Sequence, residues 1–373
     1  MIVELLQELI RIPSENNGVT GYEYAVQKYY YDFLIANGIE AEMIFPDEVP
    51  GFAESPGRLK EHLMYMRPAV IASLQGSRPG KTLLLMAHAD TVPVGEIAKW
   101  KTPPFSGMVK DGRIYGRGSG DDKFGMAVMA GLIIELKKRN CDFAGKLIIA
   151  SVPDEESGGG NGTAAVFAHG VKADEAIYLD GGSNQTVWNV GQGGGFCTIT
   201  GDNVDEIRQA VYDTKQEIIR KIENHPYFGE KFFNTIGSRD ISMGVSNNSV
   251  TFFYDTLPGD DEEELKAALE ARLPGCKFKW MSRFLKPAYV PENSPLITGL
   301  GAAFRKVTGR EMAVLGGIQS DQGLVMMLAD IPCILFGCSR RGLPGSPHQP
   351  DEFIEIEVFR EVYETLLEMI VSR

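Results

Sequence analysis

The chain is poor in cysteine and has no long hydrophobic run. Its five cysteines are odd in number and include no C-x-x-C pair, which excludes a zinc ribbon and a disulfide framework. No apolar stretch approaches the ~20 residues that cross a bilayer. The first residues carry neither a basic leader nor a small-residue cleavage site. We therefore expect a cytoplasmic protein that does not insert into a membrane.

Positive charge is also scarce. The 37 lysines and arginines are outnumbered by 50 aspartates and glutamates, which gives a net charge of −13. Such an acidic chain is a poor partner for nucleic acid or for an anionic membrane, so we expect a small-molecule substrate. The length of 373 residues exceeds the size at which a single core stops growing, and two domains are expected.

Histidines and acidic residues follow the predicted buried strands. The apolar runs LLLMA, KLIIASV, AIYL and PCILFG are each followed by such residues, and the turn GRGSGDDK adds another. Because the carboxyl ends of parallel strands meet at the ligand-binding edge of an open α/β sheet, we expect these side chains to come together there. The set consists of His88, Asp90, Asp121, Glu155, Glu156, Asp180 and His348.

This set is rich in oxygen and nitrogen and contains no sulfur, which suits divalent Zn, Co or Mn. We expect His88 to be a ligand and Asp90, which points the same way two residues on, to fix its tautomer. A carboxylate left over beside the metal would serve as a general base. Plainer explanations stay open: a structural histidine at His88 or His348, a solvated turn at the glutamate pair, and an Asp-Gly turn at Asp180. Other histidines, such as His62, have no partner spacing and are expected at the surface.

The order of the motifs resembles a known family. H-x-D, W-x-x-x-P-F, G-R-G-x-x-D-D-K, D-E-E, D and H-x-x-x-E follow one another as in the di-zinc aminoacylases and exopeptidases that include acetylornithine deacetylase, succinyl-diaminopimelate desuccinylase and carboxypeptidase G. The match begins at ELLQELIRIPSENN, passes through Trp100 and GGIQSDQG, and closes at His348 and Glu352. It therefore covers most of the chain.

The resemblance implies two divalent metal ions in each subunit, with zinc expected and cobalt or manganese as alternatives. In a site of this kind His88 and Asp180 hold one ion, Glu156 and His348 hold the other, and Asp121 bridges the two. The ligand set then uses five side chains.

The same resemblance assigns roles to the remaining acidic residues. Glu155 would be the general base, and Asp90 would orient His88. The peptide bond between Asp121 and Asp122 would be cis.

The order of predicted strands and helices changes near the middle of the chain. Up to about Asn189 strands alternate with helical patterns, which is typical of βαβ units and a parallel sheet. From Gly191 a strand-helix-strand-helix unit follows, and around Pro291 the first pattern resumes. We predict an α/β fold with a doubly wound, mainly parallel sheet. The catalytic metal-binding domain would comprise residues 1–189 and 292–373, and an inserted α+β lid and dimerisation domain would comprise residues 190–291.

The predicted lid departs from the family. Relatives carry a histidine after the first lid strand that reaches a partner subunit's active site and stabilises the oxyanion, whereas GFCTITGDNVDEIRQ has none. Arg340 and Arg341 are the local candidates to bind a substrate carboxylate as bidentate donors, although a solvated basic turn explains them equally well. Asn247 or Asn248 is the candidate oxyanion donor.

We predict a metal-dependent hydrolase that cleaves the amide bond of a small N-acyl amino acid or dipeptide, with metal-activated water and a glutamate base. The alternative is a metal-loaded, non-catalytic binding or regulatory protein on the same fold. The missing lid histidine favours this alternative, and the complete ligand set opposes it. The resemblance also implies a homodimer through the lid. The apolar character of the stretch SVTFFYDTL suggests that it pairs with a partner along an exposed edge.

Overall fold

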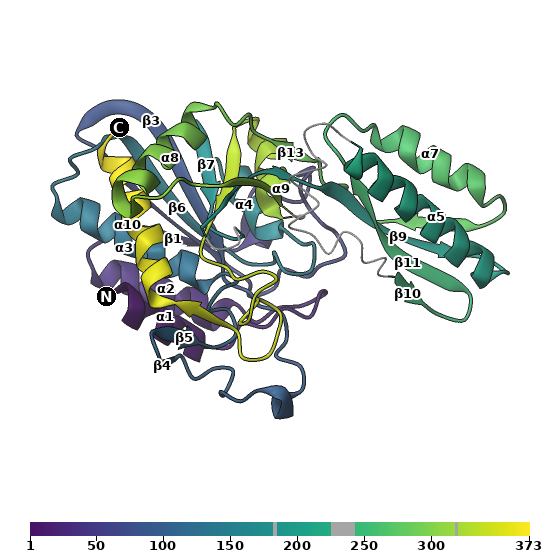
Figure 1. Ribbon diagram of the computed structural model, residues 1–373, viewed down its shortest axis with the longest axis horizontal. Helices are drawn as coiled ribbons and strands as arrows, with labels where there is room; N and C mark the ends of the chain where they lie inside the picture. The colour runs from purple at the N-terminus through teal and green to yellow at the C-terminus, as the bar shows by residue number, and fades with distance from the viewer. Residues whose placement is uncertain (182–184, 225–242, 318–319) are drawn as a thin grey trace.

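Two sheets organise the chain, and Figure 1 shows the second one standing apart from the main body on the right. The structure is a computed structural model that describes residues 1–181, 185–224, 243–317 and 320–373. No helix among these residues is long and apolar enough to cross a membrane.

The main sheet has nine strands among the described residues, and its middle is parallel. Strands β6, β3, β7 and β15 run parallel to one another, and antiparallel strands flank this block on both sides. The parallel strands are buried along their apolar stretches, as expected for a sheet covered on both faces. In spatial order the strands are β1 (Ala41–Ile44), β2 (Ala69–Gln75), β6 (Ala144–Val152), β3 (Arg78–His88), β7 (Glu175–Tyr178), β15 (Cys333–Phe336), β8 (Val187–Gly191) and β13 (Ala288–Tyr289), with β14 (Val314–Gly317) beside β8.

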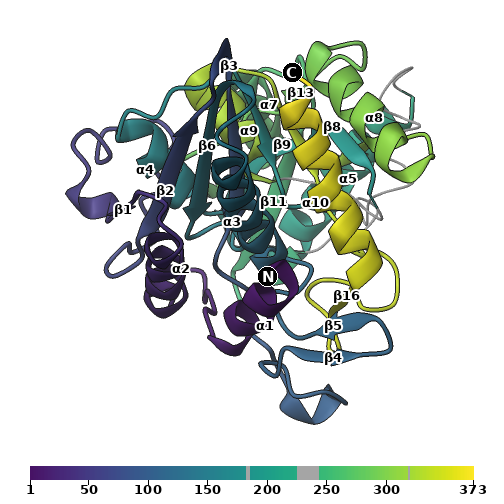
Figure 2. The same ribbon diagram turned by 90° about the vertical axis from the view of Figure 1, so that its left-hand side faces the viewer.

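Helices cover both faces of this sheet. One face packs against α1 (Ile2–Arg11), α2 (Tyr24–Ala36), α3 (Lys123–Lys138), α8 (Pro295–Thr308) and α10 (Ile356–Val371). Figure 2 shows α3 and α10 in front of the sheet. The other face packs against α4 (Asn161–Ala168) and α9 (Asp321–Ala329). The three layers confirm the predicted α/β class.

The second sheet is antiparallel and is covered on one face by two helices. It contains β10 (Met243–Val245), β11 (Ser249–Thr256), β9 (Gly193–Thr200) and β12 (Lys277–Trp280), in that spatial order, with α5 (Val204–Glu223) and α7 (Glu262–Arg272) packed on it. Each helix begins at a side-chain cap. Asn203 accepts a hydrogen bond from the backbone of Glu206, and Asp261 accepts one from Glu264. We refer to this unit as the lid.

One expectation about the lid is wrong. The apolar stretch SVTFFYDTL is no exposed edge, because its strand β11 is hydrogen-bonded to β10 on one side and to β9 on the other.

The ends of the lid lie between strands of the two sheets. The lid sheet begins at Gly193, while the main-sheet strands β8 and β13 reach Gly191 and Ala288. The boundaries at 190 and 291 stay a prediction.

A small third sheet ties the end of the chain to its middle. Strand β16 (Phe353–Glu355) pairs with β5 (Arg113–Tyr115), which in turn pairs with β4 (Met108–Lys110). The pairing of Phe353 with Tyr115 brings the loop before β16 against the turn that leads into α3.

Candidate metal centre

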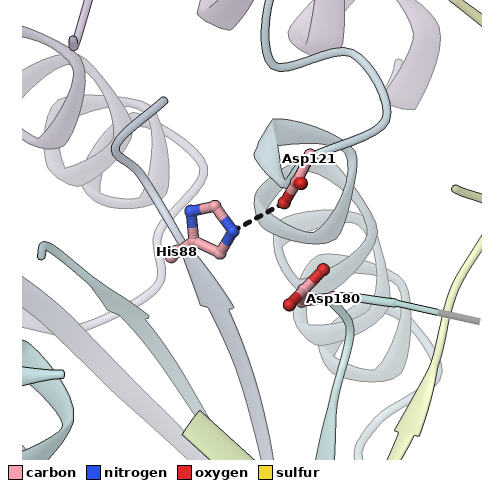
Figure 3. A group of neighbouring side chains, drawn as sticks. All are labelled: His88, Asp121 and Asp180. Carbon is pink, nitrogen blue, oxygen red and sulfur yellow. Dashed lines mark hydrogen bonds and ion pairs between the residues drawn. The ribbon is translucent and has the colours of Figure 1, made fainter. Parts of the chain in front are cut away.

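His88, Asp121 and Asp180 form a first group of donors at the carboxyl edge of the main sheet. His88 is the last residue of β3, Asp180 follows β7, and Asp121 lies in the turn before α3. The Nε2 atom of His88 is 2.9 Å from Oδ1 of Asp121, and Figure 3 shows these two side chains facing each other with Asp180 alongside. One ligand atom from each residue lies within 4.8 Å of the others.

A second group consists of Asp121, Glu156 and His348. The Nε2 atom of His348 lies 3.1 Å from Oδ2 of Asp121 and 2.9 Å from Oε2 of Glu156. The two oxygens of Asp121 therefore face different groups, with Oδ1 toward His88 and Oδ2 toward His348. The structure thus brings together all five side chains that the sequence nominated as ligands, with Asp121 shared. The Asp121–Asp122 peptide is cis, as the resemblance implied.

The electrostatics of the five side chains suit divalent cations. Burial raises the pKa of Asp180 and of Glu156, and the nearby charge of Asp121 raises both further. Ionised carboxylates crowded in a buried site repel one another and need a strong counter-charge. Oxygen and imidazole nitrogen donors are ligands that zinc and similar ions accept. The residues present therefore fit a metal centre of the kind the sequence suggested.

Glu155 lies beside the first group without belonging to either group. Its Oε2 atom is 4.0 Å from Nε2 of His88, and its side chain is 13% exposed. Burial raises its pKa. This carboxylate lines the same cavity as Glu156 and His348.

Asp90 does more than the sequence suggested. The Nδ1 atom of His88 lies 2.9 Å from the backbone carbonyl of Asp90 but 3.6 Å from its carboxylate. The carboxylate instead accepts hydrogen bonds from the backbone amides of Glu155, at 3.0 Å, and Glu156, also at 3.0 Å. Asp90 therefore connects the exit of β3 to the turn that carries the two glutamates.

Glu352, noted in the sequence only for its spacing from His348, holds the turn before Asp121. One oxygen accepts from the amide of Gly120 at 2.8 Å, and the other pairs with Arg117 at 2.6 Å. The Arg117 guanidinium lies over the ring of Trp100. These motif residues pack against one another and shape the loops that carry Asp121 and His348.

Sequence reasoning missed several buried polar residues behind the glutamate pair. Asn16, Arg67 and Asp154 are each at most 1% exposed and contact one another through Asp154. The prediction that His62 is a surface residue is wrong, because its side chain is 8% exposed and its Nδ1 atom lies 2.9 Å from Asp154. The stretch IPSENN contains Asn16 and belongs to the segment that resembles the family, so it could have pointed to this residue.

A cavity of about 290 Å³ opens between the metal groups and the lid. The lid contributes Phe253 and Asp255 from β11, and the Asp255 carboxylate pairs with Lys215. The described residues that line the cavity are Glu155, Glu156, Gly158, Gln192, Phe253, Asp255, Leu285, Ser320, Asp321, Arg341 and His348.

The two candidate arginines have different surroundings. Arg341 lines the cavity, and its Nη2 atom lies 3.0 Å from Oδ2 of Asp121 and 3.3 Å from Oδ1 of Asp180. Arg340 points elsewhere: it donates to the carbonyl of Pro344, pairs with Glu355 at 3.1 Å and is not among the described residues that line the cavity. Its contact with the substrate stays a prediction that these partners do not favour.

The two candidate asparagines also lie away from the cavity. Asn247 and Asn248 are exposed in the turn between β10 and β11. Phe253, the first residue of β11 that lines the cavity, lies roughly 16 Å further along the strand from Asn248 at ~3.3 Å per residue. The role of the two asparagines as oxyanion donors stays a prediction that this separation does not favour.

Comparisons with known proteins agree with this geometry. The model of peptidase family M20/M25/M40 matches residues 84–372. A succinyl-diaminopimelate desuccinylase from Methylibium petroleiphilum is 25% identical over 329 residues, covering 79% of this chain and 83% of that protein. One from Methylobacterium nodulans is 36% identical over 165 residues, which span 44% of this chain and only 37% of the relative.

Solved structures share the fold. An M20 family metallo-carboxypeptidase from Sulfolobus solfataricus matches with a TM-score of 0.73 and 17% identity, over 99% of this chain and 98% of that one. A tripeptidase from Staphylococcus aureus matches with a TM-score of 0.67 and 17% identity, over 100% and 97%. At this level of identity the likeness concerns the fold alone.

Proposed function

Because the chain belongs to peptidase family M20/M25/M40 and is a metal-dependent peptidase or amidohydrolase of that family, we propose that it cleaves the amide bond of a small N-acyl amino acid or dipeptide. The observation that carries this proposal is the pair of donor groups that share Asp121, with the free carboxylate of Glu155 beside them. The names of the desuccinylase relatives support an acylated amino acid.

Five side chains would hold two metal ions. We propose that His88 and Asp180 bind one ion and that Glu156 and His348 bind the other, with Asp121 between them. Zinc suits these donors, and cobalt or manganese are alternatives. When bound, such ions supply Lewis acidity and make water more acidic.

Glu155 is proposed as the general base. It would accept the proton of the attacking water and deliver it to the departing amine. Asp90 supports this role, because its carboxylate holds the backbone amides of Glu155 and Glu156 and its carbonyl contacts His88. Asp90 thus positions both the proposed base and a proposed metal ligand from the end of β3.

The cavity walls suit a small substrate with an apolar part and an anionic part. Phe253 and Leu285 provide apolar surface, and Arg341 provides a guanidinium that can bind a carboxylate with two parallel hydrogen bonds. A cavity of about 290 Å³ is compatible with a small substrate such as a dipeptide.

We also propose a homodimer formed through the lid. Among the residues that the structure describes, the lid sheet has two candidate edges, β10 and β12. Strand β12 exposes Lys277 and Lys279, and charged lysines on an edge oppose pairing with another strand. Strand β10 exposes the apolar Val245, which is 49% accessible, and is the more suitable edge.

A substrate screen tests the proposed activity. Metal-loaded protein is incubated with a mixed library of N-acyl amino acids and dipeptides, and release of free amine is measured with and without a chelator. We expect amine release that the chelator abolishes and that added Zn, Co or Mn restores. Tight metal binding without any amine release would instead support the non-catalytic binding protein.

A further inference from the structure

Asp154 stands next to the glutamate pair but belongs to neither metal group. It is the first residue of the D-E-E motif, its side chain is fully buried, and its backbone is left-handed with φ 68°. Its Oδ1 atom lies 2.9 Å from Nδ1 of His62 and 2.9 Å from Nη1 of Arg67. The proposed chemistry gives this buried carboxylate no task.

Asn16 connects Asp154 to Asp90. Its Nδ2 atom donates to Oδ2 of Asp90 at 2.8 Å and lies 3.3 Å from Oδ1 of Asp154. The Asp90 carboxylate that receives this bond also holds the backbone amides of Glu155 and Glu156. The neutral amide thus joins two carboxylates, one directly before the glutamates in the chain and one beneath their backbone.

The segment that carries Asn16 is itself fixed to the exit of β3. The amide of Asn16 donates to the carbonyl of Thr91 at 2.8 Å, and the amide of Thr91 donates to the carbonyl of Ser14 at 3.0 Å. The hydroxyl of Ser14 donates to the carbonyl of Ala89 at 2.6 Å. Asn16 is therefore held in register with Asp90 by backbone contacts on both sides.

Close packing surrounds the outer end of this network. Arg67, which contacts Asp154, also donates to both oxygens of Glu23 at 2.6–3.0 Å. A Cβ atom at Gly21 would lie 2.5 Å from Arg67 and from Glu23, and one at Gly159 would lie 2.6 Å from the carboxylate of Asp154. The network therefore packs directly against Gly21 and Gly159, where any side chain would clash with it.

We propose that Asn16 is a positioning residue that, by bridging Asp90 and Asp154, keeps the Glu155 carboxylate aimed into the cavity. The proposal rests on the proposed function, in which Glu155 is the general base. A general base must stay within hydrogen-bond reach of the proton it accepts, and a displacement of ~1 Å costs about 10²-fold in rate. The bridge controls the backbone on which Glu155 stands, so its loss acts on catalysis without removing a metal ligand.

The test compares Asn16→Ala and the similarly sized Asn16→Leu with Asn17→Ala, a neighbouring exposed asparagine. Because leucine keeps about the size of asparagine but has no hydrogen-bond donor, it separates lost packing from the lost hydrogen bond. The measurements on metal-loaded protein are kcat, KM, metal content and hydrogen exchange of the peptide that contains Glu155 and Glu156. Both Asn16 variants should lose ~10–100-fold in kcat. Their KM and metal content should equal those of the parent, their Glu155 and Glu156 amides should exchange faster, and Asn17→Ala should behave as the parent.

Two results would overturn the proposal. One is a parent-like kcat in both Asn16 variants. The other is a loss of kcat that only follows a loss of folded or metal-loaded protein, since that would make Asn16 a purely structural residue. If the parent cleaves no substrate, the proposed function fails, but amide exchange still decides the question. Parent-like exchange of the Glu155 and Glu156 amides in both variants would then show that Asn16 does not hold this turn.

Discussion

The Nε2 atom of His348 lies 3.1 Å from Oδ2 of Asp121, although the whole lid separates these residues in the chain. Two contacts explain the approach. Strand β16 begins five residues after His348 and pairs with β5 just before the Asp121 turn, and Glu352 accepts a hydrogen bond from Gly120 next to Asp121. The second metal group is therefore assembled by a small sheet outside the main one, whereas His88 and Asp180 are placed by the main sheet itself.

The two glutamates should respond differently to the same substitution. Glu155→Gln removes a carboxylate that lies beside the first group and belongs to neither, so we expect metal content near that of the parent and a loss of ~10²–10⁴-fold in kcat. Glu156→Gln is the matched control, because it alters a donor that contacts His348, and it should lose one metal ion. Elemental analysis combined with steady-state kinetics measures both. Loss of a metal ion from Glu155→Gln with retention in Glu156→Gln would mean that the two roles are reversed.

Glu352→Gln should weaken the second metal group more than the first. The substitution removes the charge that Arg117 pairs with inside the protein and loosens the turn that orients Asp121 and His348. Supporting residues of this kind cost ~10–100-fold in metal affinity when changed. Competition with a chromophoric chelator should reveal two weakened ions, with the larger loss at the second group, because Asp121 belongs to both groups and His348 only to the second.

The control for this prediction is Glu355→Gln. Glu355 has a 35% exposed side chain and pairs with Arg340 near the surface. It should bind both ions with parent affinity. Equal weakening of both ions in Glu352→Gln would contradict the assignment of Glu352 to one side of the site.

The sequence predicted the candidate donors His88, Glu156 and Asp180 from the parallel strands that they end or follow, because the carboxyl ends of such strands meet at one edge of the sheet. Asp121 and His348 lie in loops, and the order of the motifs indicated them. Asn16 and Asp154 were not predictable in this way. Their proximity depends on the backbone pairing of Asn16 with Thr91 and on the left-handed backbone of Asp154. Neither feature leaves a periodic pattern in the sequence.

The error about the exposed edge has a similar origin. Composition indicates that SVTFFYDTL is a strand, but its pairing with β10 on one side and β9 on the other depends on contacts across the sheet. The same register decides where Asn247 and Asn248 lie. The partner of Arg340, Glu355, is likewise brought close only by the folded loop.

Lys123→Met should destabilise the catalytic domain. The buried ammonium of Lys123 donates to the carbonyls of Leu9, at 3.0 Å, and Ile12, at 2.7 Å, at the end of α1. Methionine fills similar space but leaves both carbonyls without this donor, and an unsatisfied buried polar group costs about 1–3 kcal/mol. Urea denaturation of both proteins at equal metal loading measures the difference in the free energy of unfolding.

Lys137→Met provides the comparison for Lys123. Lys137 is exposed, and its ammonium reaches the carbonyl of Gly38 at the surface. Surface changes of this kind usually stay within about 0.5 kcal/mol. The free energy of unfolding of Lys123→Met could instead lie as close to that of the parent as the value for Lys137→Met does. That result would show that water replaces the lost donor at the end of α1.

Val245→Lys should convert the proposed homodimer into a monomer that keeps most of its activity. Val245 lies on β10, whose only strand partner among the described residues is β11, and a lysine there would oppose pairing with a second subunit. Lys277→Glu on β12 is the control and should leave the dimer intact, because that edge is not the proposed contact. Light scattering gives the mass and a chelator-sensitive amine assay gives the activity.

The monomer should stay active because the described residues that line each cavity belong to its own chain, including Phe253 and Asp255 of its own lid. A folded, metal-loaded monomer without turnover would show that a lid group acts across the interface even though the first lid strand is followed by no histidine.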